Sequence, residues 1–208
     1  MKPIIVINLK TYQQGKEVIK LAKIIEKVDR NIIVGVQTSD IKEISDKTRL
    51  KVYAQHVDYM EPGRETGFVI PESVKADGAA GTFLNHSEHP LKIDAIKKTI
   101  ERCKKLKLKT MVFVGNLNEA RKIEKLRPDY IIYEPPELVG GKISVSEAKP
   151  NIISEIVKKI KIPILVGAGI KKREDVQTAM KLGAFGIGVS SAITKSKNPG
   201  RVLRELLS

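Results

Sequence analysis

Short apolar segments alternate with helical patterns along the whole chain, and this alternation limits the folds that the chain can adopt. The first of these segments, residues 4–9, is a continuous apolar run rich in β-branched residues, as expected of a strand covered on both faces. Apolar residues at helical spacing follow the first segment at Val18, Leu21, Ala22, Ile25 and Val28. Eight strands are predicted in this way, at residues 4–9, 32–36, 51–55, 78–83, 110–114, 129–133, 164–166 and 186–189.

Strands that alternate with helices predict a parallel sheet, and eight such units predict a closed (β/α)8 barrel. No break in composition interrupts the pattern, so we expect one barrel domain over residues 1–208. The alternative is an open doubly wound sheet. Its usual glycine-rich dinucleotide turn is missing, because Asn-Leu-Lys-Thr-Tyr follows the first strand at residues 8–12.

The length of the chain affects the helices of this barrel. A chain of 208 residues is short against the roughly 250 that are typical of the fold. We therefore expect trimmed helices, the second and third above all, and apolar edges that favour oligomerisation. One helix is expected at about residues 118–126, and another is expected to begin at Pro150, because proline suits a first helical position.

The net charge of the chain is strongly positive, with 38 Lys and Arg against 24 Asp and Glu, a balance of +14. Such a balance suits nucleic acid or the steering of a small anionic substrate. The lysines recur on the outer faces of predicted helices, and aromatic residues, at 4%, do not interleave with them. We therefore expect a solvated lysine-rich exterior and no nucleic-acid partner.

The cellular location is also constrained by the sequence. The single cysteine, Cys103, suits a reducing interior, because it has no internal partner for a disulfide. No apolar run approaches the roughly 18 residues of a membrane helix, and the N-terminus has no signal-peptide layout. We expect a cytoplasmic protein without a membrane partner.

One stretch, residues 133–142, combines a stiff carboxylate with a flexible loop. Glu134 ends a predicted strand and precedes Pro135, which restricts it to extended geometry. An apolar tip and two glycines follow, which is the composition of a hinged lid. A fixed carboxylate under a lid suits a catalytic base in a site that excludes water. The alternative is a surface loop with a solvated glutamate.

Further chemistry-bearing residues follow other predicted strands. In a (β/α)8 barrel the carboxyl ends of the strands form the active-site face. These residues supply a base, an imidazole, a cation and small residues with accessible backbone amides. They are Asn8, Lys10, Asn85, His86, Ser87, Glu88, Glu134, Gly167, Gly169, Ser190 and Ser191.

Each of these residues also has a purely structural interpretation. Lys10 is one lysine among many, and His86 suits a structural histidine; His56 and His89 are taken as structural or solvent-facing. The glycines suit turns, although glycine also lets an anion reach the backbone. The Ser190-Ser191 pair suits an N-cap or a phosphate site at a helix start. Their joint position at five strand ends favours a site.

Six motifs occur in order from one end of the chain to the other. They are Asn8-Leu9-Lys10, Ala54-Gln55-His56-Val57-Asp58, Leu84-Asn85-His86-Ser87-Glu88, Tyr133-Glu134-Pro135, Gly167-Ala168-Gly169-Ile170 and Ser190-Ser191. Together they resemble the triosephosphate isomerase family in its compact archaeal form. Asn-x-Lys alone is a weak signal, whereas Asn-His-Ser-Glu followed by Tyr-Glu-Pro at this distance is a strong one.

The resemblance implies the interconversion of dihydroxyacetone phosphate and glyceraldehyde 3-phosphate, in glycolysis and gluconeogenesis, without a metal or cofactor. It implies that Glu134 is the base and that His86 polarises the carbonyl, as a neutral imidazole in the accepted account of this family. Lys10 supplies positive charge, and Asn8 orients the Lys10 side chain and the substrate oxygen. Glu88 is an orienting carboxylate behind Lys10. The resemblance places Val139, Gly169, Ser190 and Ser191 around the phosphate.

The sequence departs from the family pattern at three places. The lid reads Gly140-Gly141-Lys142 where Gly-Thr-Gly is usual, so we expect a looser closed state. Ala192 stands where glycine is common, and phosphate affinity falls if that position needs a positive φ. Phe113 stands where relatives often have a cysteine.

The long third loop ends in a tip at Thr66-Gly67. In the resembling family this tip enters a neighbouring subunit and braces the corner formed by Asn8 and Lys10. We therefore expect at least a homodimer, or a homotetramer. Two other functions stay open: a different phosphate-binding barrel, such as a prenyl or indole-forming enzyme, and a non-catalytic phosphate-binding relative.

Overall fold

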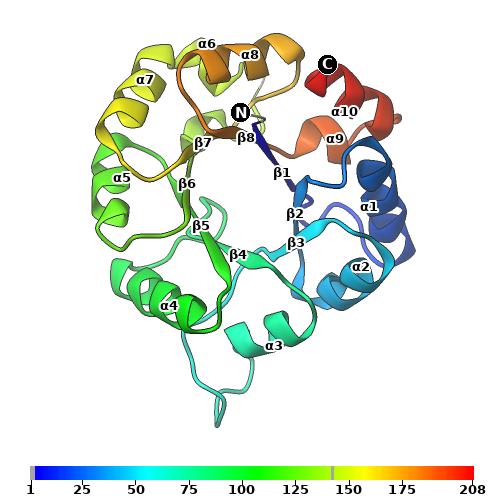
Figure 1. The fold of residues 1–208 in the computed structure, drawn as a ribbon, viewed down its shortest axis with the longest axis vertical. Coiled ribbons are helices and arrows are strands. Elements are labelled where there is room, and N and C mark those ends of the chain that lie inside the picture. Colours follow the sequence, from blue (N-terminus) through cyan, green and yellow to red (C-terminus); the bar gives the residue numbers. More distant parts are fainter. Residues whose placement is uncertain (1–2, 142) are drawn as a thin grey trace.

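The computed structural model describes residues 3–141 and 143–208, and it forms a closed barrel of parallel strands ringed by helices (Figure 1). The strands pair in sequence order from β1 to β8, and β8 closes the barrel on β1. The strands are β1 Ile4–Asn8, β2 Ile33–Val36, β3 Lys51–Ala54, β4 Gly81–Leu84, β5 Lys109–Val114, β6 Tyr130–Tyr133, β7 Ile164–Val166 and β8 Gly186–Val189. The predicted fold class is confirmed.

Helices follow the strands and cover the outside of the barrel (Figure 1). They are α1 Lys16–Val28, α2 Ile41–Lys47, α3 Pro71–Ala76, α4 Ile93–Lys105, α5 Leu117–Glu124, α6 Val145–Ala148, α7 Pro150–Lys159, α8 Arg173–Lys181, α9 Ser191–Thr194 and α10 Pro199–Leu207, with 3-10 turns η1 Thr38–Asp40 and η2 Pro136–Leu138. The expected trimming is confirmed, since α2 has 7 residues and α3 has 6.

Two expected boundaries shift by two residues or more, and one helix appears that was not expected. The fourth strand lies at Gly81–Leu84 rather than 78–83, because Gly78 adopts a φ of 96° in the turn before it. Helix α5 is Leu117–Glu124 rather than 118–126, and it begins after Asn116, whose side chain accepts a hydrogen bond from the Glu119 amide. Helix α7 does begin at Pro150, but the four-residue α6, capped by Ser144, precedes it.

Aromatic side chains and glycines together fill the inside of the barrel. Phe83, Phe113 and Tyr53 belong to one buried cluster there. A Cβ on Gly35 would lie 1.9 Å from the Phe83 ring, and one on Gly81 would lie 2.5 Å from the Tyr53 ring. The missing side chains therefore give the large rings their space, and the packed rings form the floor beneath the mouth of the barrel.

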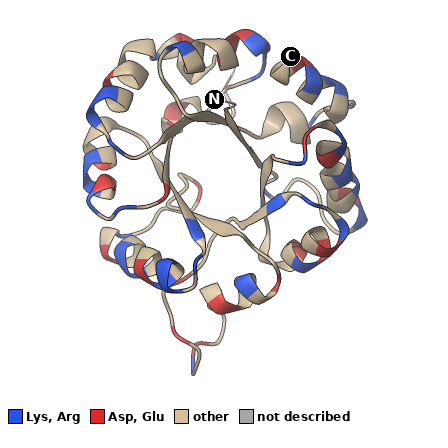
Figure 2. Ribbon diagram, viewed as in Figure 1, with Lys and Arg blue, Asp and Glu red and all other residues tan. Residues whose placement is uncertain are grey.

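The surface of the molecule agrees with the expected solvated exterior. Figure 2 shows Lys and Arg mixed with Asp and Glu over the outer helices. The loop between β3 and α3, which bears Thr66, projects beyond the ring of helices (Figure 1). Within the described ranges, the helices are all too short or too polar to cross a membrane.

Candidate active site

The carboxyl ends of the strands bring the predicted site residues to one rim of the barrel. Asn8 is the last residue of β1, and Glu134 directly follows β6. His86 lies two residues beyond β4, and Ser190 directly follows β8. Asn8, Lys10, His86, Glu134 and Ser190 line one small cavity at this rim.

The two oxygens of Glu134 have different surroundings. Its backbone amide donates to the Val114 carbonyl at 2.9 Å, so the residue continues the β5–β6 ladder before Pro135 ends it. Oε1 accepts a hydrogen bond from the Ala168 amide at 3.1 Å. Oε2 is buried, lies 3.0 Å from Nε2 of His86, and has no aligned hydrogen bond within the described residues. One oxygen is anchored and the other is free to take a proton.

The hydrogen bonds of His86 define its tautomer. Nδ1 accepts a hydrogen bond from the Glu88 amide at 3.0 Å, so in the neutral ring the proton resides on Nε2, which faces Glu134. The ring is 9% exposed, and it packs edge-on against Phe113 with a centroid separation of 4.7 Å. Phe113, one of the departures from the family pattern, thus forms the floor under the imidazole.

Lys10 occupies a strained turn that its neighbours stabilise. Its φ is 50°, which is uncommon for a residue with a side chain. Its amide donates to Oδ1 of Asn8 at 3.0 Å, and its carbonyl accepts from Nε2 of Gln55 at 2.9 Å. Nζ lies 2.5 Å from Oε1 of Glu88. These contacts aim the ammonium group across the mouth of the barrel.

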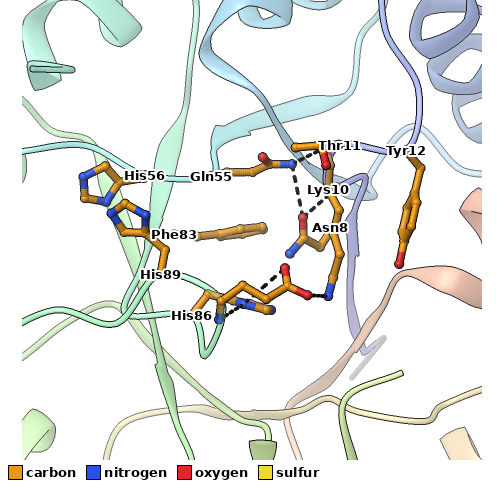
Figure 3. A pocket seen from close by; sticks show the side chains of 10 residues that line it. Asn8, Lys10, Thr11, Tyr12, Gln55, His56, Phe83, His86 and His89 are labelled. Atoms are coloured by element: carbon orange, nitrogen blue, oxygen red, sulfur yellow. Dashed lines mark hydrogen bonds and ion pairs between the residues drawn. The ribbon is translucent and has the colours of Figure 1, made fainter. Parts of the chain in front are cut away.

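A cavity of about 420 Å³ opens beside this corner (Figure 3). Its lining includes residues to which the sequence assigned no part in a site: Gln55, His56 and His89. Gln55 joins Asn8, Lys10 and Gly35 by hydrogen bonds from a single amide nitrogen. The position of Gln55 and His56 directly after β3 is the signal that could have identified them, since the other site residues also follow strands.

The two extra histidines pack against each other with their rings tilted by 45° and their centroids 4.3 Å apart. Nε2 of His56 lies 3.1 Å from Oδ1 of Asp58, and Nδ1 is buried without a hydrogen-bond partner in the described structure. Burial lowers the pKa of His56, although the hydrogen bond to Asp58 opposes this shift. The expectation that His56 is structural agrees with this position, while His89 is exposed at the cavity mouth.

The residues expected to hold phosphate lie together on the other side of Lys10. Val139, Gly169, Ser190 and Ser191 line a space of about 40 Å³ with Lys10 and Glu134. The Ser190 side chain makes no capping bond to α9, and its Oγ is buried without a partner in the described parts of the chain. Ser190 therefore occupies the N-cap position of α9, as one interpretation of the sequence expected, but its hydroxyl does no capping and is available to a ligand.

Gly169 has a second reason to be a glycine. Its φ is 69°, and a Cβ at this position would lie 2.2 Å from the Ile143 carbonyl oxygen at the end of the lid. The lid therefore rests directly on the backbone of Gly169, a contact that the sequence does not indicate.

The remaining departures from the family pattern lie in α9 and in the lid. Ala192 lies within α9 and is not among the residues with a positive φ, so alanine causes no backbone strain there. Gly140 has a φ of 70°, whereas Gly141 does not need a positive φ. Lys142 lies outside the described residues. Thr66 is exposed at the tip of its loop and does not line the cavity beside Lys10.

The chemistry of this rim matches acid–base catalysis by side chains. A carboxylate with a free oxygen faces an imidazole that donates from Nε2, and an ammonium group is nearby. Across residues 3–141 and 143–208, groups of three or more His, Cys, Asp or Glu with metal-site geometry are absent.

Comparison with known proteins agrees with this geometry. The family model described as triosephosphate isomerase matches residues 3–206. The chain belongs to the triosephosphate isomerase family. The triosephosphate isomerase of Methanocaldococcus jannaschii is 41% identical over 215 residues, covering 98% of this chain and 98% of the relative. That of Sulfolobus acidocaldarius is 42% identical, covering 99% of this chain and 94% of the relative.

A crystal structure of triosephosphate isomerase from Bartonella henselae has the same fold, with a TM-score of 0.77 over 100% of this chain and 97% of that chain. At 17% identity this match shows the fold alone. The archaeal relatives confirm the sequence-based resemblance to the compact archaeal form of the triosephosphate isomerase family.

Proposed function

We propose that this protein interconverts dihydroxyacetone phosphate and D-glyceraldehyde 3-phosphate through an enediolate, with Glu134 as the base. The observation that supports this best is the 3.0 Å approach of Glu134 Oε2 to His86 Nε2, with Oε1 anchored on the Ala168 amide. A base and a hydrogen-bond donor that share one narrow slot suit proton transfer next to a carbonyl.

The proposed reaction begins when substrate enters this slot and separates the two side chains. Glu134 removes a proton from the carbon next to the carbonyl, and the Nε2–H of His86 donates to the oxygen that becomes negative. The hydroxyl proton then passes through His86 from one oxygen of the enediolate to the other, and Glu134 returns its proton to the former carbonyl carbon, which gives the other triose phosphate. Neutral imidazole suits this task, as the accepted account of pKa tuning in this family holds, and Nδ1 already accepts the Glu88 amide.

The other predicted residues take supporting roles in this proposal. Lys10, aligned by Asn8 and Glu88, neutralises charge on the enediolate and the phosphate. Val139, Gly169, Ser190 and Ser191 surround the phosphate, and the unpartnered Ser190 hydroxyl donates to it. Lid closure excludes water, because an exposed enediolate phosphate expels its phosphate group.

The proposed setting is a homo-oligomer in the cytoplasm that acts in glycolysis and gluconeogenesis. The single cysteine supports a reducing compartment. The projecting loop that bears Thr66 supports self-association, since its tip is exposed and does not line the cavity beside Lys10. No added metal or cofactor enters the proposed chemistry.

The test is turnover of the wild-type protein in both directions, followed by the Glu134→Gln variant. Glutamine keeps the shape but cannot accept the proton, so we expect kcat to fall by about 10²–10⁴-fold. A coupled assay with either triose phosphate measures this. Glu155→Gln, on the exposed face of α7, is the matched control and should keep wild-type turnover.

Two outcomes would contradict the proposal. A wild-type protein without turnover that still binds a phosphate analogue at Ser190 and Ser191 would be a non-catalytic relative. A Glu134→Gln variant with turnover within about tenfold of wild type would assign the base to another residue, because a general base contributes more than that.

A further inference from the structure

The loop between β7 and α8, residues 167–172, makes three contacts with the lid and with the segment that directly follows it, residues 143–145. The Val145 amide donates to the Ala168 carbonyl at 3.1 Å, and the Ile143 carbonyl rests against Gly169. The third contact lies within the lid itself, where Nζ of Lys171 donates to the Gly141 carbonyl at 2.8 Å. The first two contacts anchor the end of the lid, whereas the third reaches its glycine pair.

The backbone of Lys171 is held firmly in place. The amides of Lys171 and Lys172 donate to Oδ2 of Asp175 at 2.9 and 3.1 Å. Asp175 is buried, at 5% exposure, and its carbonyl accepts a hydrogen bond from the Ser146 hydroxyl at 3.0 Å. The side chain of Lys171 therefore extends toward the lid from a fixed origin, although the lysine itself is exposed.

The glycine pair of the lid needs an external contact to be ordered. Gly140 and Gly141 lose more conformational freedom on ordering than other residues. Within the lid, the Gly141 amide bonds to the Leu138 carbonyl at 3.0 Å, which closes a local turn. Among the described residues, it is the ammonium group of Lys171 that fixes the Gly141 carbonyl to the barrel.

We propose that Lys171 is a positioning residue that holds the lid over the phosphate end of the site; this role rests on the proposed function. Val139 and Gly140 of the lid line the small space shared with Gly169, Ser190 and Ser191. A charged donor on the Gly141 carbonyl, one residue further along, keeps this part of the lid in place. Loss of this contact releases the lid and admits water to the enediolate.

The experiment compares the wild type with Lys171→Met and Lys171→Arg. Methionine keeps the length of the chain but removes the donor, whereas arginine retains one. Lys181→Met is the matched control, because it removes the same charge at the last residue of α8, at the opposite end of that helix from the lid. Hydrogen–deuterium exchange of the peptide covering residues 136–145 reports on the lid without any substrate.

In Lys171→Met we expect the lid amides to exchange about three- to tenfold faster, the size expected for the loss of one hydrogen bond whose charge is screened by solvent. Lys171→Arg and Lys181→Met should exchange like the wild type. In turnover, Lys171→Met should release several-fold more inorganic phosphate per isomerisation, because the intermediate loses its phosphate in a wetter site. A merely structural lysine would not change that ratio.

Two results would overturn the inference: unchanged lid exchange and phosphate release in Lys171→Met, or an equal change in Lys181→Met. Failure of the proposed function is distinguishable from both. It would show as a wild type without isomerisation, while the exchange measurement would still report whether Lys171 holds the lid.

Discussion

At the scale of single residues, Glu134 depends on the absence of a side chain next to it. A Cβ on Gly167 would lie 2.6 Å from Oε1 and 3.3 Å from Cδ of Glu134. The same oxygen accepts the Ala168 amide, whose residue has a φ of 74°. The carboxylate is thus seated directly on the backbone after β7, and its position is sensitive to any added atom.

The close packing of the Glu134 carboxylate on the backbone of Gly167 leads to a prediction for Gly167→Ala. The added methyl group pushes the carboxylate away from the Ala168 amide, so we expect kcat to fall by about tenfold to a hundredfold, as small misplacements of catalytic groups do. Steady-state kinetics measures this effect. Gly188→Ala is the control at the same rim, because its Cβ would meet its nearest neighbours at 3.7 and 3.8 Å, an ordinary contact.

The control should lose much less activity than Gly167→Ala. Equal kinetics for Gly167→Ala and the wild type would show that the base has room to move without loss. In that case the seat against the backbone after β7 would not determine the orientation of the carboxylate.

At the scale of elements, the projecting loop is joined to the barrel through helix α4. Arg102 of α4 has a side chain that is only 10% exposed. It lies 3.1 Å from Glu61 in the loop and forms a second ion pair with Glu72 of α3. One guanidinium group therefore links the projecting loop and α3 to α4. Both segments come before α4 in the chain, and β4 lies between them and α4.

We expect Arg102→Met to reduce the free energy of unfolding by about 1–3 kcal/mol, because it leaves Glu72 half-buried without its cation. Most of this loss of stability comes from the ion pair with Glu72, since Glu61 is 80% exposed and exposed ion pairs contribute little. Urea denaturation measures the change. The double variant Arg102→Met with Glu72→Gln should recover part of the lost free energy of unfolding. A double variant that is no more stable than Arg102→Met would argue against a stabilising ion pair between Arg102 and Glu72.

At the scale of the whole molecule, the projecting loop predicts self-association. Its tip, with Thr66, is exposed, and the cavity beside Lys10 is open in the single chain. We expect at least a dimer by sedimentation equilibrium at micromolar concentration. Thr66→Arg, which adds bulk and charge to a tip that must be buried in such a dimer, should weaken association. A wild-type protein that sediments as a monomer would contradict this expectation.

The sequence alone predicted that the candidate site residues gather at one rim, as they do, for a physical reason that applies to every barrel of this class. Glu134, His86 and Lys10 were identified because each follows an apolar strand, and parallel strands end at one rim. Helix α6 was missed, because four residues show no helical periodicity. The fourth strand was placed too early, because Gly78 and its small neighbours resemble a strand in composition but form a turn.

Local sequence therefore determined the repeating units, their order, and which residues face the mouth of the barrel, because hydrophobic spacing is a property of neighbours along the chain. Only the tertiary structure decided which groups touch. The contact of Lys171 with Gly141 spans 30 positions, and the anchoring of Glu134 on Ala168 spans 34. Gln55 likewise reaches Lys10 across 45 positions. Such contacts depend on closing the barrel, which brings together strand ends that no local pattern relates.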